Sequence, residues 1–184
     1  ISWLDVGAGY GEIVEAVERL AAPGSAVGGV EPMEAKASHA RKRGLKVQTS
    51  YLEEGHTKVD FVSIVDVFSH IPQFDDFLLT VKGALLPGGE LFIETGNLAD
   101  VENREGFAGE LGLPDHLVFA GETHLNGYLK RAGFEILRIE RVRVDGLIYF
   151  AKNIVKASLS RAVRVRTPYR SRFRQLLIRA KLQV

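Results

Sequence analysis

Residues 59–67, VDFVSIVDV, are apolar on both faces of an extended chain, and this run constrains the fold more than any other stretch. A strand of this kind is typical of the centre of a parallel sheet, because helices cover both faces of such a sheet. Four further strands are expected, at residues 3–6, 27–30, 45–49 and 90–95. Apolar residues at helical spacing separate them and predict helices at 13–21, 33–43 and 74–85. The alternation predicts an α/β fold with a mostly parallel sheet.

The last part of the sequence predicts a change in strand direction. A helix expected at 123–132 is followed by apolar runs at 134–142 and 147–154, and Asp145-Gly146 between these runs is a hairpin signal. We therefore expect a three-layer sandwich with a seven-stranded, mostly parallel sheet whose last strand is antiparallel. We expect one domain at 1–154 and a basic, helical C-terminal extension at 155–184. Because the chain starts at Ile1 and its first strand follows at once, we also expect an N-terminal segment of the native chain to be missing.

Composition excludes several classes of protein. The chain has 184 residues, of which 46% are hydrophobic and 26% charged, as in an ordinary globular domain. It has no cysteine, which excludes disulfides, thiolate metal sites and a cysteine nucleophile, and we expect no metal site. No run approaches the roughly 18 uncharged apolar residues of a membrane span, and no signal peptide is visible. These features favour a cytoplasmic protein.

Basic residues are concentrated at the end of the chain. Residues 151–184 contain ten of the 24 Lys and Arg residues and none of the 23 Asp and Glu residues. This segment is either a solvated basic helix or a docking surface for a phosphate-bearing partner or an acidic membrane.

The first expected strand runs directly into a glycine-rich turn, LDVGAGYGE at residues 4–12. A dinucleotide fingerprint, G-x-G-x-x-G, would place its third glycine one residue later than Gly11. Tyr10 and Glu12 bring bulk and an acid to the start of the helix, and Asp5 lies close by, which makes a poor setting for a pyrophosphate. The turn favours a ligand with a positive amine or sulfonium.

These residues resemble the class I S-adenosylmethionine (SAM) dependent methyltransferases. LDVGAGYGE looks like their first motif, and GGVEP, VDFVSIVDVFSHIP, LLPGGELFIET and LKRAGFEILRIE follow in the order of that family. PDHLVF and THLNGYLKRAGFE are similar to a subgroup that acts on small molecules. The resemblance covers residues 1–154 and implies a Rossmann-like methyltransferase fold.

The resemblance implies a cofactor site for SAM. Glu31, at the end of the second strand, would accept hydrogen bonds from both ribose hydroxyls, a role that NAD-binding folds share. The other expected cofactor residues are Asp5, Gly7, Gly9, Gly11, Tyr51, Leu52 and Asp66. Alternatives stay open for some of them. Glu31 could be a surface acid, Asp5 a local cap for the turn, and Tyr51 and Leu52 plain core contacts.

The loop after the fourth strand, DVFSHIP, would lie near the transferred methyl group. Many relatives have a Glu-His pair there, whereas this chain has Ser69-His70, which puts metal-assisted or carboxylate-assisted chemistry in doubt. His70 is either a general base that also contacts the acceptor or a structural residue of the loop. Further along, Asn97 and His124 are candidate acceptor-binding residues.

The predicted function is methyl transfer from SAM to a small-molecule acceptor at oxygen by direct displacement, with S-adenosylhomocysteine as product. An RNA or protein methyltransferase that uses the basic tail is one alternative, and a non-catalytic SAM-binding domain is another. A NAD-dependent oxidoreductase is the third. The sequence alone identifies neither the acceptor nor the oligomeric state.

Overall fold

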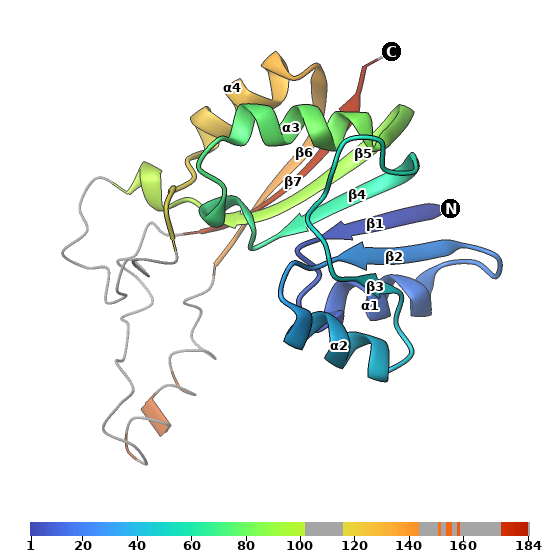
Figure 1. Ribbon diagram of the computed structural model, residues 1–184. Coiled ribbons are helices and arrows are strands. Elements are labelled where there is room, and N and C mark those ends of the chain that lie inside the picture. The colour runs from blue at the N-terminus through green and yellow to red at the C-terminus, as the bar shows by residue number, and fades with distance from the viewer. Residues whose placement is uncertain (102–115, 144–150, 152–153, 156–157, 159–173, 184) are drawn as a thin grey trace.

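The computed structural model describes residues 1–101, 116–143, 151, 154, 155, 158 and 174–183, and its core is a single seven-stranded sheet (Figure 1). The strands are β1 (Ser2–Val6), β2 (Ala26–Val30), β3 (Val47–Gln48), β4 (Val59–Val65), β5 (Leu85–Gly96), β6 (Phe134–Val142) and β7 (Gln175–Leu182). The main helices are α1 (Glu12–Leu20), α2 (Glu34–Lys42), α3 (Phe74–Gly83) and α4 (Glu122–Arg131). The short 3₁₀ helices are η1 (Phe68–His70) and η2 (Leu98–Asp100).

The sheet has the strand order β3-β2-β1-β4-β5-β7-β6. β7 is antiparallel to both of its neighbours, and every other pairing is parallel. The order reverses between β1 and β4, and in such sheets ligands bind beyond the carboxyl ends of the strands at this point. The predicted α/β class, with a mostly parallel sheet and an antiparallel last strand, is confirmed.

Two hydrophobic clusters lie on opposite faces of the sheet. Helices α1 and α2 pack over β2 and β3 through Val14, Ala37 and Ala40 on one face. Helices α3 and α4 cover the other face from β4 to β6 (Figure 1). The run at β4 is buried as expected, with no exposed area at Val62 or Ile64.

The expected hairpin after β6 is wrong, because the strand that pairs with β6 comes from the basic tail. Residues 144–150 lie outside the described part of the chain, and Ala151 and Ile154, expected in a strand, are helical. The helical extension expected at 155–184 is likewise replaced at 175–182 by β7, so the sheet continues past the boundary expected at residue 154.

The sequence of β7, QLLIRAKL, alternates as a strand that is buried on one face. Leu176, Ile178 and Ala180 have no exposed area, whereas Arg179 and Lys181 point to the other face. Arg179 donates to both carboxylate oxygens of Glu90 on β5, at 2.5 and 3.0 Å. Part of the basic charge of the tail therefore faces acids of the neighbouring strand.

None of the helices in the part of the chain that the structure describes could span a membrane.

The place of β7 can be tested by truncating a side chain in its buried row. Ile178→Ala should lower the free energy of unfolding by about 2–5 kcal/mol, because it leaves a cavity under α3 and α4. Leu137→Ala, on β6 where the side chain is 43% exposed, is the control and should cost less than about 1 kcal/mol. Urea unfolding measures both, and equal losses would contradict the burial of β7.

Candidate functional site

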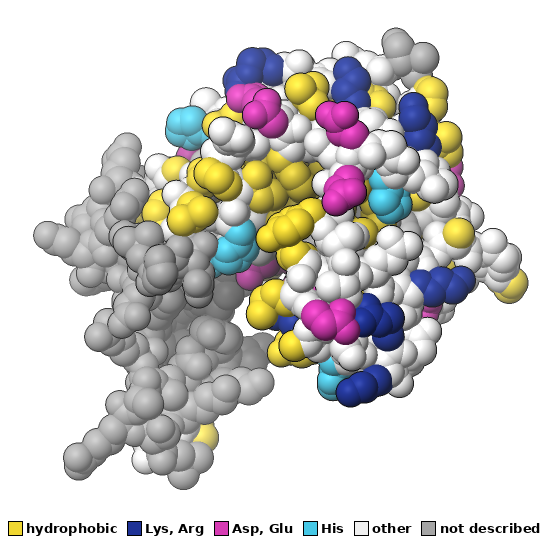
Figure 2. Space-filling view, in the orientation of Figure 1, with side chains coloured by type: hydrophobic (Ala, Val, Ile, Leu, Met, Phe, Trp, Pro, Cys, Tyr) yellow, Lys and Arg dark blue, Asp and Glu magenta, His cyan; other side chains and the backbone are white. Residues whose placement is uncertain are grey.

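A cavity of about 610 Å³ opens at the carboxyl ends of β1, β2 and β4, where the strand order reverses. This volume lies within the range of small-molecule sites. In Figure 2 hydrophobic side chains gather in a band across the middle of the molecule. The cavity is lined by Val6, Gly7, Val30, Glu31, Pro32, Met33, Lys36, Ser50, Tyr51, Leu52, Val65, Asp66, Val67, His70, Ile71, Pro72 and Phe77.

The glycine turn between β1 and α1 needs glycine for two different reasons. Gly7, Gly9 and Gly11 all have positive φ, at 75°, 57° and 88°, which disfavours other residues. At Gly7 a Cβ would also collide with the Val67 side chain, and at Gly11 with Leu45. At Gly9 a Cβ would find its nearest neighbour only at 3.8 Å. The turn is thus tightly packed at both ends and open in its middle.

Glu31 joins the end of β2 to this turn. Its side chain is 5% exposed, and Oε2 accepts a hydrogen bond from the Gly9 amide at 2.9 Å. Oε1 accepts from the Met33 amide, also at 2.9 Å. Each carboxylate oxygen has a second lone pair, so Glu31 can accept further hydrogen bonds from a ligand in the cavity.

Asp5 lies beneath the turn and is 2% exposed. It is not among the residues that line the cavity. Its Oδ1 accepts a hydrogen bond of 2.5 Å from the Ser63 hydroxyl, which in turn accepts one of 2.9 Å from the Trp3 indole N–H. Burial raises the pKa of Asp5 to about 7, against the lowering effect of the Ser63 hydrogen bond, and the charges of Glu12 and Glu31 raise it further.

Asp66 follows the end of β4 in an unusual backbone conformation. Its φ is 55°, and it is the only residue other than glycine with positive φ among those that the structure describes. The amide of Asp66 donates to the Glu94 carbonyl at 3.1 Å, which holds this conformation against β5. Such strain costs about 1–3 kcal/mol and often occurs at functional sites. The exposed Asp66 side chain lines the cavity.

His70 lies at the edge of the cavity, on η1, and its ring meets that of His116 edge to face with centroids 5.2 Å apart. The segment that bears His116 is fixed by two hydrogen bonds, because the Leu117 and Val118 amides both donate to the Ser69 carbonyl. The Ser69 hydroxyl is buried and has no hydrogen-bond partner among the described residues.

Tyr51 and Leu52 line the cavity from the loop that follows β3. Tyr51 is 74% exposed, whereas Leu52 packs partly against the core. Other residues line the cavity that the sequence did not predict, chiefly Met33 and Phe77. The position of Met33 directly after Glu31 and Pro32, at the end of a strand, was the signal that could have identified it.

Two predicted acceptor-binding residues do not line this cavity. The Asn97 side chain accepts a hydrogen bond of 2.6 Å from the Arg174 amide and so ties the end of β5 to the start of β7. His124 is exposed on the first turn of α4. Neither is therefore brought together with Glu31 and Asp66. No group of three or more His, Asp and Glu side chains within the described residues could hold a metal ion.

Comparison with known sequences assigns the chain to a family. Residues 1–139 match a family model described as a methyltransferase domain. A ubiquinone biosynthesis O-methyltransferase from Agrobacterium fabrum is 31% identical in an alignment of 103 residues, which covers 51% of this chain and 40% of that protein. The chain thus spans about two fifths of the length of the curated relatives it matches.

Comparison with solved structures gives the same fold. The phosphoethanolamine N-methyltransferase 2 of Haemonchus contortus, in complex with SAM, has a TM-score of 0.76 at 16% identity, over 100% of this chain and 49% of that one. A SAM-dependent methyltransferase from Archaeoglobus fulgidus has a TM-score of 0.72 at 17% identity, over 98% of this chain and 85% of that one. The resemblance to class I SAM-dependent methyltransferases, drawn from the sequence, is confirmed.

The raised pKa of Asp5 predicts how stability depends on pH. From pH about 4 to 7 the folded protein keeps a proton on Asp5 that the unfolded chain releases, so the free energy of unfolding falls as the pH rises, by at most about 4 kcal/mol. Asp5→Asn removes this contribution. Urea unfolding at pH 5 and pH 8 should therefore show the variant gaining stability relative to the parent protein. If the free energies of unfolding of the variant and the parent differed by the same amount at pH 5 and at pH 8, the raised pKa of Asp5 would be refuted.

Proposed function

The chain belongs to the family of methyltransferase domains, and from this premise we propose that it transfers a methyl group from SAM to an oxygen atom of a small-molecule acceptor. S-Adenosylhomocysteine is the second product. The observation that carries the proposal is the place of Glu31, a nearly buried carboxylate at the end of β2 that faces the cavity and holds the Gly9 amide. A carboxylate in this position suits the two ribose hydroxyls of a nucleoside.

The acids near the glycine turn suit the positive charge of SAM. Glu12 and Glu31 lie close enough to Asp5 for their charges to raise its pKa, and the same two charges favour a positive ligand near the turn. SAM carries a sulfonium and an amine, and the open face of Gly9 lets such a ligand approach the backbone. Tyr51 and Leu52 would contact the adenine, and Asp66 the methionine part.

The cofactor, when bound, supplies an activated methyl group and its own leaving group. The chain then has to align the acceptor oxygen with the methyl carbon and exclude water, and alignment can supply roughly 7–11 kcal/mol of the barrier. His70 lines the cavity and would accept the proton of the acceptor hydroxyl. The contact with His116 would orient the His70 ring for this role.

Two observations support a small, partly apolar acceptor. The cavity wall beside His70 is formed by Ile71, Pro72 and Phe77, and relatives of this chain are named as O-methyltransferases of ubiquinone biosynthesis. An RNA or protein acceptor held by the basic tail has less support. Residues 175–182 of that tail form β7, where Arg179 is bound to Glu90.

Replacing Glu31 tests the cofactor site directly. Glu31→Gln should weaken SAM binding by about 10- to 100-fold, because the ribose hydroxyls lose a charged acceptor worth roughly 1.5–3 kcal/mol. Glu53→Gln, an exposed acid in the loop after β3 that does not line the cavity, makes the same change in charge and should bind SAM as the parent does. Isothermal titration calorimetry measures both, and equal affinities would overturn the role of Glu31.

The acceptor atom can be tested with paired probes. Incubation with SAM and phenols that carry apolar tails should release S-adenosylhomocysteine and the methyl ether, measured by mass spectrometry, whereas the matching anilines should react more slowly. His70→Gln should lower kcat by about 100-fold or more and leave the SAM affinity unchanged. Methylation of the anilines alone would contradict transfer to oxygen, and the absence of turnover with either series would favour a binding domain.

A further inference from the structure

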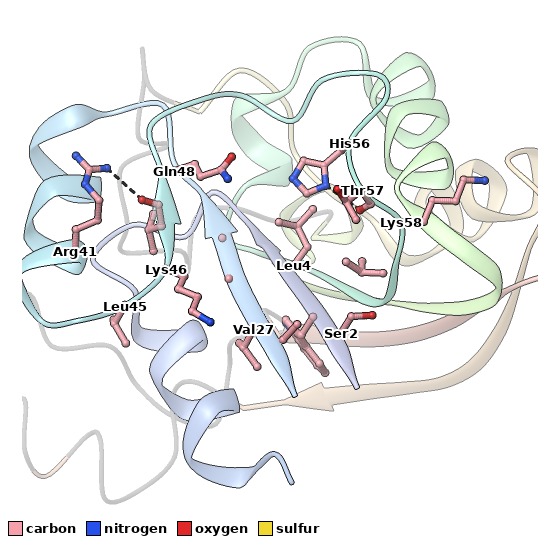
Figure 3. A pocket seen from close by; sticks show the side chains of 16 residues that line it. Ser2, Leu4, Val27, Arg41, Leu45, Lys46, Gln48, His56, Thr57 and Lys58 are labelled. Carbon is pink, nitrogen blue, oxygen red and sulfur yellow. Dashed lines mark hydrogen bonds between the residues drawn. The ribbon is translucent and has the colours of Figure 1, made fainter. Parts of the chain in front are cut away.

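A second hollow, of about 390 Å³, lies over the amino-terminal parts of β1 and β2 and over β3. Its floor consists of residues that alternate along the three strands and so share one face of the sheet, namely Ser2 and Leu4, Ala26 and Gly28, and Lys46 and Gln48. Residues 56–59 form its wall (Figure 3). We call this hollow the strand trough. None of its lining residues lines the cofactor cavity.

The strand trough exists because this part of the sheet carries small side chains and no helix. Helices α1 and α2 pack on the opposite face, and α3 covers the strands from β4 onward (Figure 1). Between β3 and β4 the chain runs as a loop, with no helix in residues 49–58. Ala26 and Gly28 therefore leave a depression between Leu4 on one side and Lys46 on the other.

The polar groups in the strand trough are suited to an anion. Figure 3 shows Lys46 reaching toward β2, with Gln48 and His56 lying across its upper part, whereas Lys58 points outward. The His56 Nδ1 lies 3.0 Å from the Thr57 carbonyl and donates to it, so Nε2 of this ring donates to an anion when the imidazole is protonated. None of the 16 lining residues is acidic.

Two acids beside lining residues of the strand trough already have partners. Asp60 accepts hydrogen bonds from the amide and the hydroxyl of Ser2, at 2.7 and 2.8 Å, and these lower its pKa. Glu34 is bound by Arg41 and Thr49 at the outer edge of β3. Within the part of the chain that the structure describes, no salt bridge joins Lys46 to an acid. Its charge is therefore available to a ligand.

We propose that the strand trough is a binding site for a small molecule that joins a phosphate group to an apolar body. Lys46, Gln48 and His56 would hold the phosphate, and Leu4, Ala26 and Val59 would contact the apolar part. The loop that follows β3 links this site to the cofactor cavity, because Tyr51 and Leu52 line the cavity while His56 and Thr57 line the strand trough. The proposal does not depend on the methyl acceptor.

Phenyl phosphate is a suitable probe, with phenol and inorganic phosphate as partial probes. In a titration of the full chain followed by amide NMR, phenyl phosphate should shift the signals of Gly28, Lys46 and Gln48 in a saturable way, and phenol should not. Lys46→Gln should weaken binding by about tenfold. Lys42→Gln removes the same charge from α2, outside the strand trough, and should change the affinity less than about twofold.

Three results would overturn the proposal. One is an equal loss of affinity in both lysine variants, which would mean that phosphate responds only to net charge. Another is displacement of phenyl phosphate by SAM, which would place the probe in the cofactor cavity. The third is the absence of shifts at Gly28, Lys46 and Gln48 while SAM still binds, which would remove this site and leave the proposed methyl transfer intact.

Discussion

The carboxylate of Glu31 connects the parts on which the candidate site depends. Its two oxygens accept from the amides of Gly9 and Met33, so one side chain fixes the glycine turn after β1 and the first residues after β2. A carboxylate that accepts two amide hydrogen bonds is held in one orientation, and its remaining lone pairs point where those bonds leave room. These lone pairs are therefore held in a fixed orientation beside the cavity, where we propose that they accept from hydroxyl groups.

Close packing holds the turn itself in place. The backbone of the turn lies against β2, because a Cβ at Gly29 would come within 2.6 Å of the Ala8 Cβ and 3.0 Å of the Asp5 carbonyl. The amides of Gly7 and Ala8 both donate to the Val30 carbonyl, at 2.9 and 3.0 Å. This arrangement brings Asp5 under the turn and away from water, at the cost of a raised pKa. The nearby charges of Glu12 and Glu31 raise that pKa further.

Residues at the ends of strands could be predicted as cavity residues from the sequence. Gly7, Glu31 and Asp66 each follow a recognisable apolar run, and the carboxyl ends of parallel strands meet at one edge of the sheet. Asn97 and His124 were expected there too, because their segment follows β5. Which way such a segment runs depends on contacts with distant residues, and the backbone of Arg174 binds the Asn97 side chain instead.

The sequence by itself determined the fold class, the glycine turn and the acids around it. The spacing of apolar residues in strands and helices, and the positive φ that glycine can adopt, are local properties of the chain. Only the tertiary structure decided which segment is the antiparallel strand. β6, at residues 134–142, pairs with β7, which begins 33 positions after β6 ends and is apolar on one face. On the other face of β7, Arg179 binds Glu90 of β5. Pairing at such a separation depends on the whole sheet, because the fit of each strand against its neighbours decides it.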